Sequence, residues 1–207
     1  MRIFQSSFGA VVAAMMLLVS QPAAAGFINF ESDAMGFVGN GFTSASDPGV
    51  HFFDTVNAEL QILSHQAIGT RALAVNWDDA SQLRMTFDST VNSLSLIFGN
   101  DDPEYASASA RAWLELFDGA TSVGLVSVQV NLNDLSDQSI AFSGANFNSA
   151  VFWYGDAAGA AIDLIEVVDN IAFDNVPTRD VPEPGSLTLL GLGFAGLAAM
   201  RRKQKTA

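Results

Sequence analysis

The sequence predicts an all-β protein, a two-sheet antiparallel sandwich of the jelly-roll type. Short runs rich in Val, Ile, Phe, Leu and Thr recur roughly every ten to fifteen residues along the body of the chain. Turn-forming residues separate these runs, as in Asp47-Pro48-Gly49 and Asp118-Gly119. Between the two ends of the chain, no long segment has the 3.6-residue apolar period of an amphipathic helix.

The chain opens with a segment that predicts a secretory signal peptide over residues 1–25. Arg2 supplies a basic start, an apolar run covers 8–19, and Ala23-Ala24-Ala25 offers small residues for cleavage before Gly26. The apolar run is short for an uncleaved membrane anchor. We therefore expect export and removal of this segment.

The β-sandwich is expected over residues 26–176. Alternation identifies the face of individual strands: Ala112, Leu114 and Leu116 share one side of the run 111–117, and Trp113 lies on the other side with charged neighbours. We expect strands, in chain order, at 27–31, 50–55, 58–63, 72–76, 82–88, 93–98, 112–117, 122–131, 138–143, 150–154 and 162–173.

The composition of the body limits its partners. The whole chain has a net charge of −13, and residues 26–180 contain 21 of its 22 acidic residues but only four arginines and no lysine, a net charge of −17. Such a charge disfavours nucleic acid as a partner. The chain has no cysteine and two histidines, which excludes disulfides, thiol catalysis and cysteine-ligated metals. No recognised enzyme motif is present, so we expect a protein that is not an enzyme.

The C-terminal residues form three successive parts. Residues 177–184 read as a linker ending in Val181, Pro182, Glu183 and Pro184, whose prolines disfavour helix. Residues 185–207 read as an apolar membrane anchor followed by the basic cluster Arg201, Arg202 and Lys203. The apolar part, 185–200, would extend about 24 Å as a helix, which is short against a hydrocarbon core of roughly 30 Å. A transient anchor is therefore expected.

This arrangement resembles the PEP-CTERM sorting signal of Gram-negative bacteria that produce exopolysaccharide. The resemblance implies a transient stay in the inner membrane, recognition by an exosortase near Pro182-Glu183-Pro184, and release to the cell surface or extracellular matrix. It covers only the tail of the chain. It predicts the destination of the protein, with exopolysaccharide as a candidate partner, and leaves the role of the body open.

Two short segments at the ends of the body resemble those of carbohydrate-binding-module-like jelly rolls. They are 28–31, which ends in Glu31, and 168–173, which contains Asp169. The resemblance implies a structural Ca²⁺ held by Glu31 and Asp169 where the first and last strands meet, and Ca²⁺ favours such oxygen ligands. In the alternative interpretation, Glu31 is an exposed residue at a strand end and Asp169 caps a turn.

Two tryptophans are the candidate ligand contacts. Trp113 shares a strand face with Arg111 and Glu115, which favours exposure, and Trp77 lies beside an acidic loop. Trp153 lies in a segment that is apolar on both faces, which favours the core. We expect a structural or glycan-associated sandwich, and the alternative is a carbohydrate-active hydrolase on the same scaffold. The sequence singles out no pair of catalytic carboxylates.

Overall fold

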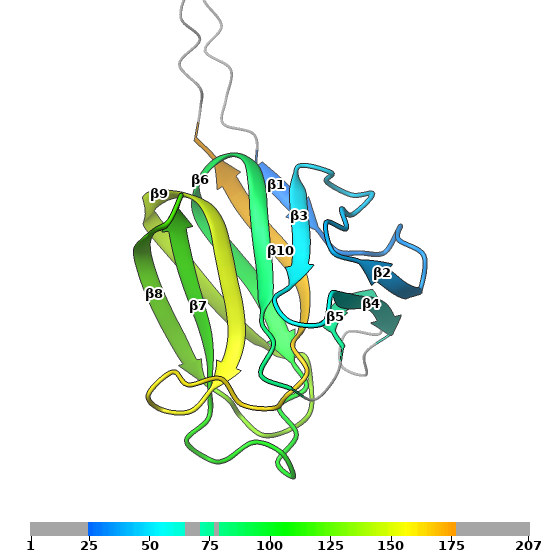
Figure 1. Ribbon diagram of the computed structural model, residues 1–207, viewed down its shortest axis with the longest axis vertical. Helices are drawn as coiled ribbons and strands as arrows, with labels where there is room; N and C mark the ends of the chain where they lie inside the picture. The colour runs from blue at the N-terminus through cyan, green and yellow to red at the C-terminus, as the bar shows by residue number, and fades with distance from the viewer. Residues whose placement is uncertain (1–24, 65–70, 77–78, 177–207) are drawn as a thin grey trace, which may run out of the picture. The chain divides into compact units, whose positions relative to one another are not determined.

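The computed structural model describes residues 25–64, 71–76 and 79–176 of the chain (Figure 1). The chain divides into two compact units, Met1–Val176 and Pro177–Ala207. The described residues contain strands, turns and loops, and among them no helix is long and apolar enough to cross a membrane. The expected helices of the signal peptide and of the C-terminal anchor fall outside these residues.

The described residues form ten strands, all paired antiparallel. In chain order they are β1 (Ala25–Ile28), β2 (Gly36–Gly39), β3 (Val50–Asp54), β4 (Glu59–Ser64), β5 (Arg71–Val75), β6 (Leu83–Gly99), β7 (Arg111–Asp118), β8 (Thr121–Gln129), β9 (Gln138–Gly155) and β10 (Val167–Asn175).

The strands build two layers that share β6 and β9, as Figure 1 shows. We call the layer of β3, the first half of β6, the second half of β9, β7 and β8 the front sheet. The back sheet contains the first half of β9, the second half of β6, and β10, followed by β5, β4 and β2, while β1 pairs with the end of β10. The all-β sandwich predicted from the sequence is therefore confirmed.

The core lies between the two sheets because one face of each central strand is apolar. In β6, Leu83, Met85 and Phe87 point inward and Arg84 and Thr86 point outward. Aromatic rings fill much of the interior, and most of the close ring pairs meet edge to face or tilted. The largest fully buried side chains are those of Tyr154, Phe30, Phe52, Phe98, Phe147 and Phe152.

The expected division into strands is wrong at two places. Residues 82–88 and 93–98 belong to one strand, β6, and residues 138–143 and 150–154 belong to β9. The pairing of β6 with β9 shifts register between Thr86 and Ser93, so the two strands bend from one sheet to the other without reversing. Gly144, which the sequence marks as a turn, lies in this bend with φ of +124°.

Two further elements differ from the prediction. β2 was not expected, because Gly36 and Gly39 are poor strand formers and only four residues take part in its pairing with β4. Residues 162–166 were expected to extend the last strand, but β10 begins at Val167. At that point the side chain of Glu166 enters the interior and accepts the backbone N–H of Tyr154 at 3.4 Å.

The segment Phe98–Asp102 fastens the loops at one end of the sandwich. Asp101 is buried, and its carboxylate accepts three backbone N–H groups: those of Asn131 and Leu132 at 2.8 Å and that of Asp134 at 3.1 Å. The hydroxyl of the buried Tyr154 donates to the carbonyl of Gly99. Gly99 has no room for a side chain, because a Cβ there would lie 2.2 Å from Cα of Ser136. The acidic turn therefore has a structural function.

Candidate ligand-binding face

The outward side of the front sheet carries His51, two of the three described arginines and both described tryptophans. Strand pairing places the outward side chains in rows that run across the strands. One row contains Arg84, Val151 and Glu115, and the neighbouring row contains Trp153 and Trp113. We call this surface the front face. Its members are His51, Phe53, Arg84, Thr86, Arg111, Trp113, Glu115, Phe117, Leu125, Ser127, Gln129, Ser149, Val151 and Trp153.

Trp113 and Trp153 form a stacked pair on this face. They are direct register partners between β7 and β9, with ring centroids 6.1 Å apart and an interplanar angle of 13°. Trp113 is half-buried, and Trp153 is 7% exposed. The prediction that Trp113 points away from the core is confirmed. Trp153 is buried, as the sequence predicts, but it lies on the outward side of the sheet and not in the main core cluster.

A tight turn at residues 156–160 covers the two indoles. The Nε1–H of Trp113 donates to the carbonyl of Asp156 at 3.2 Å, and that of Trp153 donates to the carbonyl of Gly159 at 3.1 Å. The carboxylate of Asp156 closes the turn by accepting the N–H groups of Ala158 and Ala160 at 2.8 and 3.0 Å. The tryptophan pair is therefore held rigidly, a property that lowers the entropic cost of binding a ligand.

Arg111 continues the front face beside the tryptophan pair. Its Cζ lies 6.0 Å from the centroid of the Trp113 ring, within the range of a cation–π contact. Its Nε donates to Oγ of Ser127 at 2.8 Å, which fixes the guanidinium toward β8. The ring and the guanidinium thus form one preorganised surface.

Arg84 and Glu115 flank Val151 in the middle of the face. All three are register partners on neighbouring strands, β6, β9 and β7. Within the residues that the structure describes, neither charged side chain makes a hydrogen bond or an ion pair. Neighbouring strands lie about 4.8 Å apart, so the backbones at Arg84 and Glu115 are separated by two strand spacings, roughly 10 Å. A positive and a negative side chain, both without a hydrogen-bond or ion-pair partner among the described residues, therefore lie on either side of Val151.

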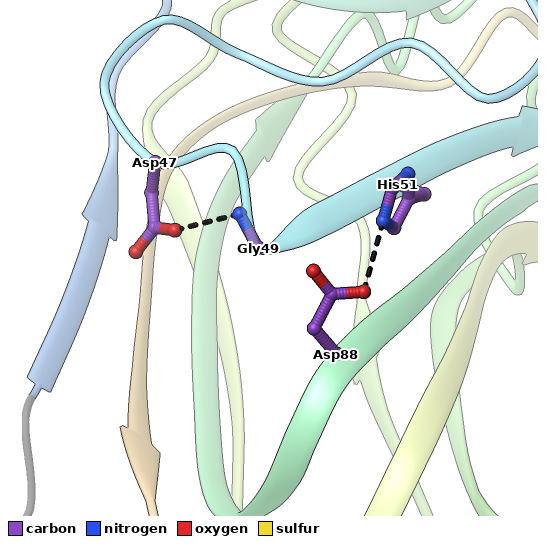
Figure 2. Close-up of polar contacts among 4 residues, drawn as sticks. All are labelled: Asp47, Gly49, His51 and Asp88. Carbon is purple, nitrogen blue, oxygen red and sulfur yellow. Dashed lines mark hydrogen bonds and ion pairs between the residues drawn. The ribbon is translucent and has the colours of Figure 1, made fainter.

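His51 and Asp88 lie at the edge of the front face, where β3 meets β6. The Nε2 atom of His51 lies 3.0 Å from Oδ1 of Asp88, a contact marked by a dashed line in Figure 2. The turn before β3 is closed by Asp47, which accepts the N–H of Gly49 at 3.0 Å. The His51 and Asp88 side chains are 36% and 68% exposed. Such exposed pairs contribute little stability.

The predicted calcium ligands lie at the β1–β10 end of the back sheet. Ile28 pairs with Ile171 in the antiparallel β1–β10 pair. Glu31, which comes after Ile28, and Asp169, which comes before Ile171, therefore lie toward the same end of this pair. Asp169 is buried, whereas Glu31 is exposed, with its Oε1 accepting the N–H of Arg71 at 2.8 Å. The guanidinium of Arg71 donates to the carbonyls of Glu31 and Asp33. Arg71 thus engages the Glu31 side chain and the neighbouring carbonyls, and calcium binding at Glu31 and Asp169 stays a prediction.

The other predicted functional residues lie outside the described part of the chain. These are Trp77, the sorting residues Val181, Pro182, Glu183 and Pro184, and the basic residues Arg201, Arg202 and Lys203. In the described residues, no group of three or more His, Asp or Glu side chains is arranged to hold a metal ion.

A groove of about 330 Å³ lies on the outward side of the back sheet, away from the front face. Small side chains line it, including Ser93, Ser95, Ala141 and Ala172, and its acidic residue Asp174 accepts the hydroxyl of Ser93 at 2.7 Å. The groove lacks the arginines and indoles of the front face. We therefore place the candidate site on the front face and not in this groove.

Comparison with protein families identifies the C-terminal tail. Residues 180–203 match the family model described as the PEP-CTERM protein-sorting motif. The chain carries a PEP-CTERM sorting motif. This motif marks an exported protein that is processed by an exosortase and sorted to the cell surface of Gram-negative bacteria. Comparison with curated proteins gave no match.

Several solved structures are similar to this chain at low identity. The C-terminal family 22 carbohydrate-binding module of Clostridium thermocellum Xyn10B is 15% identical, with a TM-score of 0.41 over 75% of this chain and 94% of the module. The CBM22-1 xylan-binding domain of Paenibacillus barcinonensis Xyn10C is 12% identical, with a TM-score of 0.37 over 76% and 98%.

A third similar structure is a larger enzyme. The arabinose-bound MgGH51 α-L-arabinofuranosidase is 17% identical, with a TM-score of 0.46 over 75% of this chain. The chain spans only 27% of the length of that enzyme. At such identities and TM-scores, none of these structures assigns a ligand or an activity to this chain.

Proposed function

We propose that this protein is a non-catalytic, glycan-associated component of the cell surface or extracellular matrix, and that its front face binds polysaccharide. The sorting motif supports export and exosortase processing, with a transient stay in the inner membrane. The body then remains as the part that acts outside the cell. Exopolysaccharide is the partner that such a destination offers.

The observation that carries this proposal is the rigid indole pair beside free polar groups. Sugars present apolar C–H faces and rims of hydroxyl groups, so their sites combine aromatic contact with a few well-placed polar side chains. Trp113 is half-buried and keeps part of its ring accessible, and Arg111 and Glu115 are the neighbours of Trp113 along β7. The side chain of Leu125, which is 52% exposed, extends the apolar part across β8.

The proposal gives the front face no catalytic function. Glycoside hydrolysis needs two carboxyl groups on either side of the scissile bond. Among the front-face positions only Glu115 supplies one, and Asp88 lies at the rim in contact with His51. The arrangement supports binding better than hydrolysis.

A structural Ca²⁺ at Glu31 and Asp169 belongs to the same proposal. The ion would join the beginning and the end of the body, where β1 pairs with β10. It would stabilise the fold and take no part in contacts of the front face.

Retention of the released protein on the exopolysaccharide of its own host tests the proposal. Trp113→Ala should weaken retention by about tenfold, since stacking contacts of this kind contribute on the order of 1 kcal/mol or more. Tyr105→Ala is the matched control, because Tyr105 is 63% exposed and lies in a loop outside the front face. Unchanged retention of a folded Trp113→Ala variant would contradict a binding role for this face.

A further inference from the structure

Positive charge is scarce in this protein, and the front face holds most of what the structure describes. Outside the termini the chain has no lysine, and its described residues include three arginines, Arg71, Arg84 and Arg111. Arg71 is engaged by the backbone carbonyls of Glu31 and Asp33 in the back sheet. Arg84 and Arg111 both lie on the front face.

Within the described part of the chain, Arg84 differs from Arg71 and Arg111 in having no hydrogen-bond or ion-pair partner. Arg71 donates to carbonyls, and Arg111 donates to Ser127 and lies over Trp113. Among the described residues, no hydrogen-bond acceptor or carboxylate engages the guanidinium of Arg84, although the body is strongly acidic. Its register partners are Phe53 and Val151, which are apolar. An exposed guanidinium in apolar surroundings keeps its five N–H donors free for a ligand.

From this placement we infer that the front face selects a carboxylated polysaccharide, with Arg84 as the residue that binds the carboxylate; this inference rests on the proposed glycan-binding function. A planar guanidinium matches a carboxylate in a two-bond fork, which a neutral sugar hydroxyl cannot offer. Uronate residues in a polysaccharide present such carboxylates at regular intervals.

The spacing of the two arginines favours an extended chain over a single sugar. Arg84 lies on β6 and Arg111 on β7, with β9 between them. Along β7, Arg111 is four residues from Glu115, which shares the row of Arg84. With about 4.8 Å between strands and 3.4 Å per residue, the two backbone positions lie roughly 16 Å apart. This separation between the two backbone positions favours an oligomer over a single sugar as a ligand that contacts both arginines.

Glu115 determines where on the front face a ligand carboxylate can bind. It stands on the other side of Val151 from Arg84, so a carboxylate placed over Glu115 would be repelled while one placed over Arg84 would be attracted. Hydroxyl groups of the same chain can donate to Glu115 instead. The acidic body repels a polyanion at long range, but this repulsion is screened beyond roughly 8 Å at physiological ionic strength, whereas direct contacts persist.

Binding of the exosortase-released protein to polygalacturonate and to carboxyl-reduced polygalacturonate tests the inference. The two probes share linkage and ring geometry and differ in charge. We expect at least about tenfold tighter binding to the charged polymer, a loss of about tenfold in Arg84→Gln, and an intermediate loss in Arg84→Lys, which keeps the charge without the fork. Arg179→Gln removes the same charge from the linker and should leave binding unchanged.

The outcomes separate the two proposals. Equal binding to both polymers, unaffected by Arg84→Gln but weakened by Trp113→Ala, would overturn the carboxylate selectivity and leave the glycan-binding function standing. Binding to neither polymer, together with retention on the host exopolysaccharide that Trp113→Ala weakens, would also overturn the selectivity alone. Binding to none of the three would overturn both proposals. Since Arg84 is exposed, its variants are expected to fold, and far-ultraviolet circular dichroism checks this.

Discussion

The indole rings of Trp113 and Trp153 stack almost parallel across neighbouring strands, with an interplanar angle of 13°, on the outside of the sheet. Both indole N–H groups donate to carbonyls of the turn at 156–160. The pair therefore links three parts of the molecule: β7, β9 and the turn that follows β9. It also gives the front face its rigid apolar surface.

A double-mutant cycle should reveal the coupling of this pair. Trp153→Ala should cost about 3–5 kcal/mol of unfolding free energy, because the side chain is 7% exposed, and the half-buried Trp113 should cost less. The coupling energy should be about 0.5–1.5 kcal/mol, as for other aromatic pairs. Urea denaturation of the purified protein measures all three variants. Equal losses for both single variants and no coupling would contradict the observed stack.

Two glycines in strands should respond to alanine in opposite ways. Gly99→Ala should destabilise by several kcal/mol, because its Cβ would lie 2.2 Å from Cα of Ser136 and the backbone must move. Gly39→Ala meets nothing within 4 Å, and its φ is not positive. That variant should be neutral or stabilising by up to about 1 kcal/mol. Thermal unfolding compares them, and similar melting temperatures would contradict the tight packing at Gly99.

Glu166 should make the stability of the body depend on pH. Burial raises the pKa of Glu166 well above its ordinary value of 4.5, and the charges of Asp79 and Asp54 raise this pKa further. The folded state therefore binds the proton more tightly than the unfolded state. The stabilisation is complete below pH 4.5 and is lost as the pH rises through the folded-state pKa.

Replacement of Glu166 by Gln should remove this part of the pH dependence. Glu166→Gln should lose less stability than the wild type between pH 4 and pH 8, because no charge forms in the interior. Glu104→Gln is the control, since it removes the same charge from an exposed loop. Denaturant titrations across this pH range decide the matter, and parallel pH profiles for the two variants would refute the role of Glu166.

Calcium should stabilise the body if Glu31 and Asp169 hold the ion. Binding to the folded state alone would add about 2.7 kcal/mol at a free concentration of 100 Kd. The melting temperature should then rise with Ca²⁺ and fall with EDTA, and Asp169→Ala should abolish the difference. A melt of the metal-stripped protein that does not respond to Ca²⁺ would end the calcium prediction.

Processing at both ends should be visible in the mass of the released protein. We expect the mature chain to lack residues 1–25 and everything after the PEP region, because the match at 180–203 marks a sorting signal. Replacing Pro182, Glu183 and Pro184 with alanine should keep the protein in the inner membrane. Intact-mass spectrometry checks the first expectation, and a released form that retains 187–207 would disprove it.

The sequence alone predicted the class of the fold and the C-terminal sorting motif, and both are confirmed. Alternation with period two and regular turn residues predict antiparallel strands, because both depend on local chain geometry. The C-terminal motif was equally readable, since its three parts follow one another directly in the sequence. Alternation also predicted that Trp113 points away from the core.

The tertiary structure decided which side chains share a surface. Trp153 lies in an apolar segment and reads as core, yet the turn at 156–160 buries it on the outside of the sheet. The bends in β6 and β9 come from register shifts, which depend on pairing between segments far apart in the chain. The rows that place Arg84, Val151 and Glu115 together arise from the same long-range pairing. No local pattern specifies such pairing, so the candidate site became visible only in the folded protein.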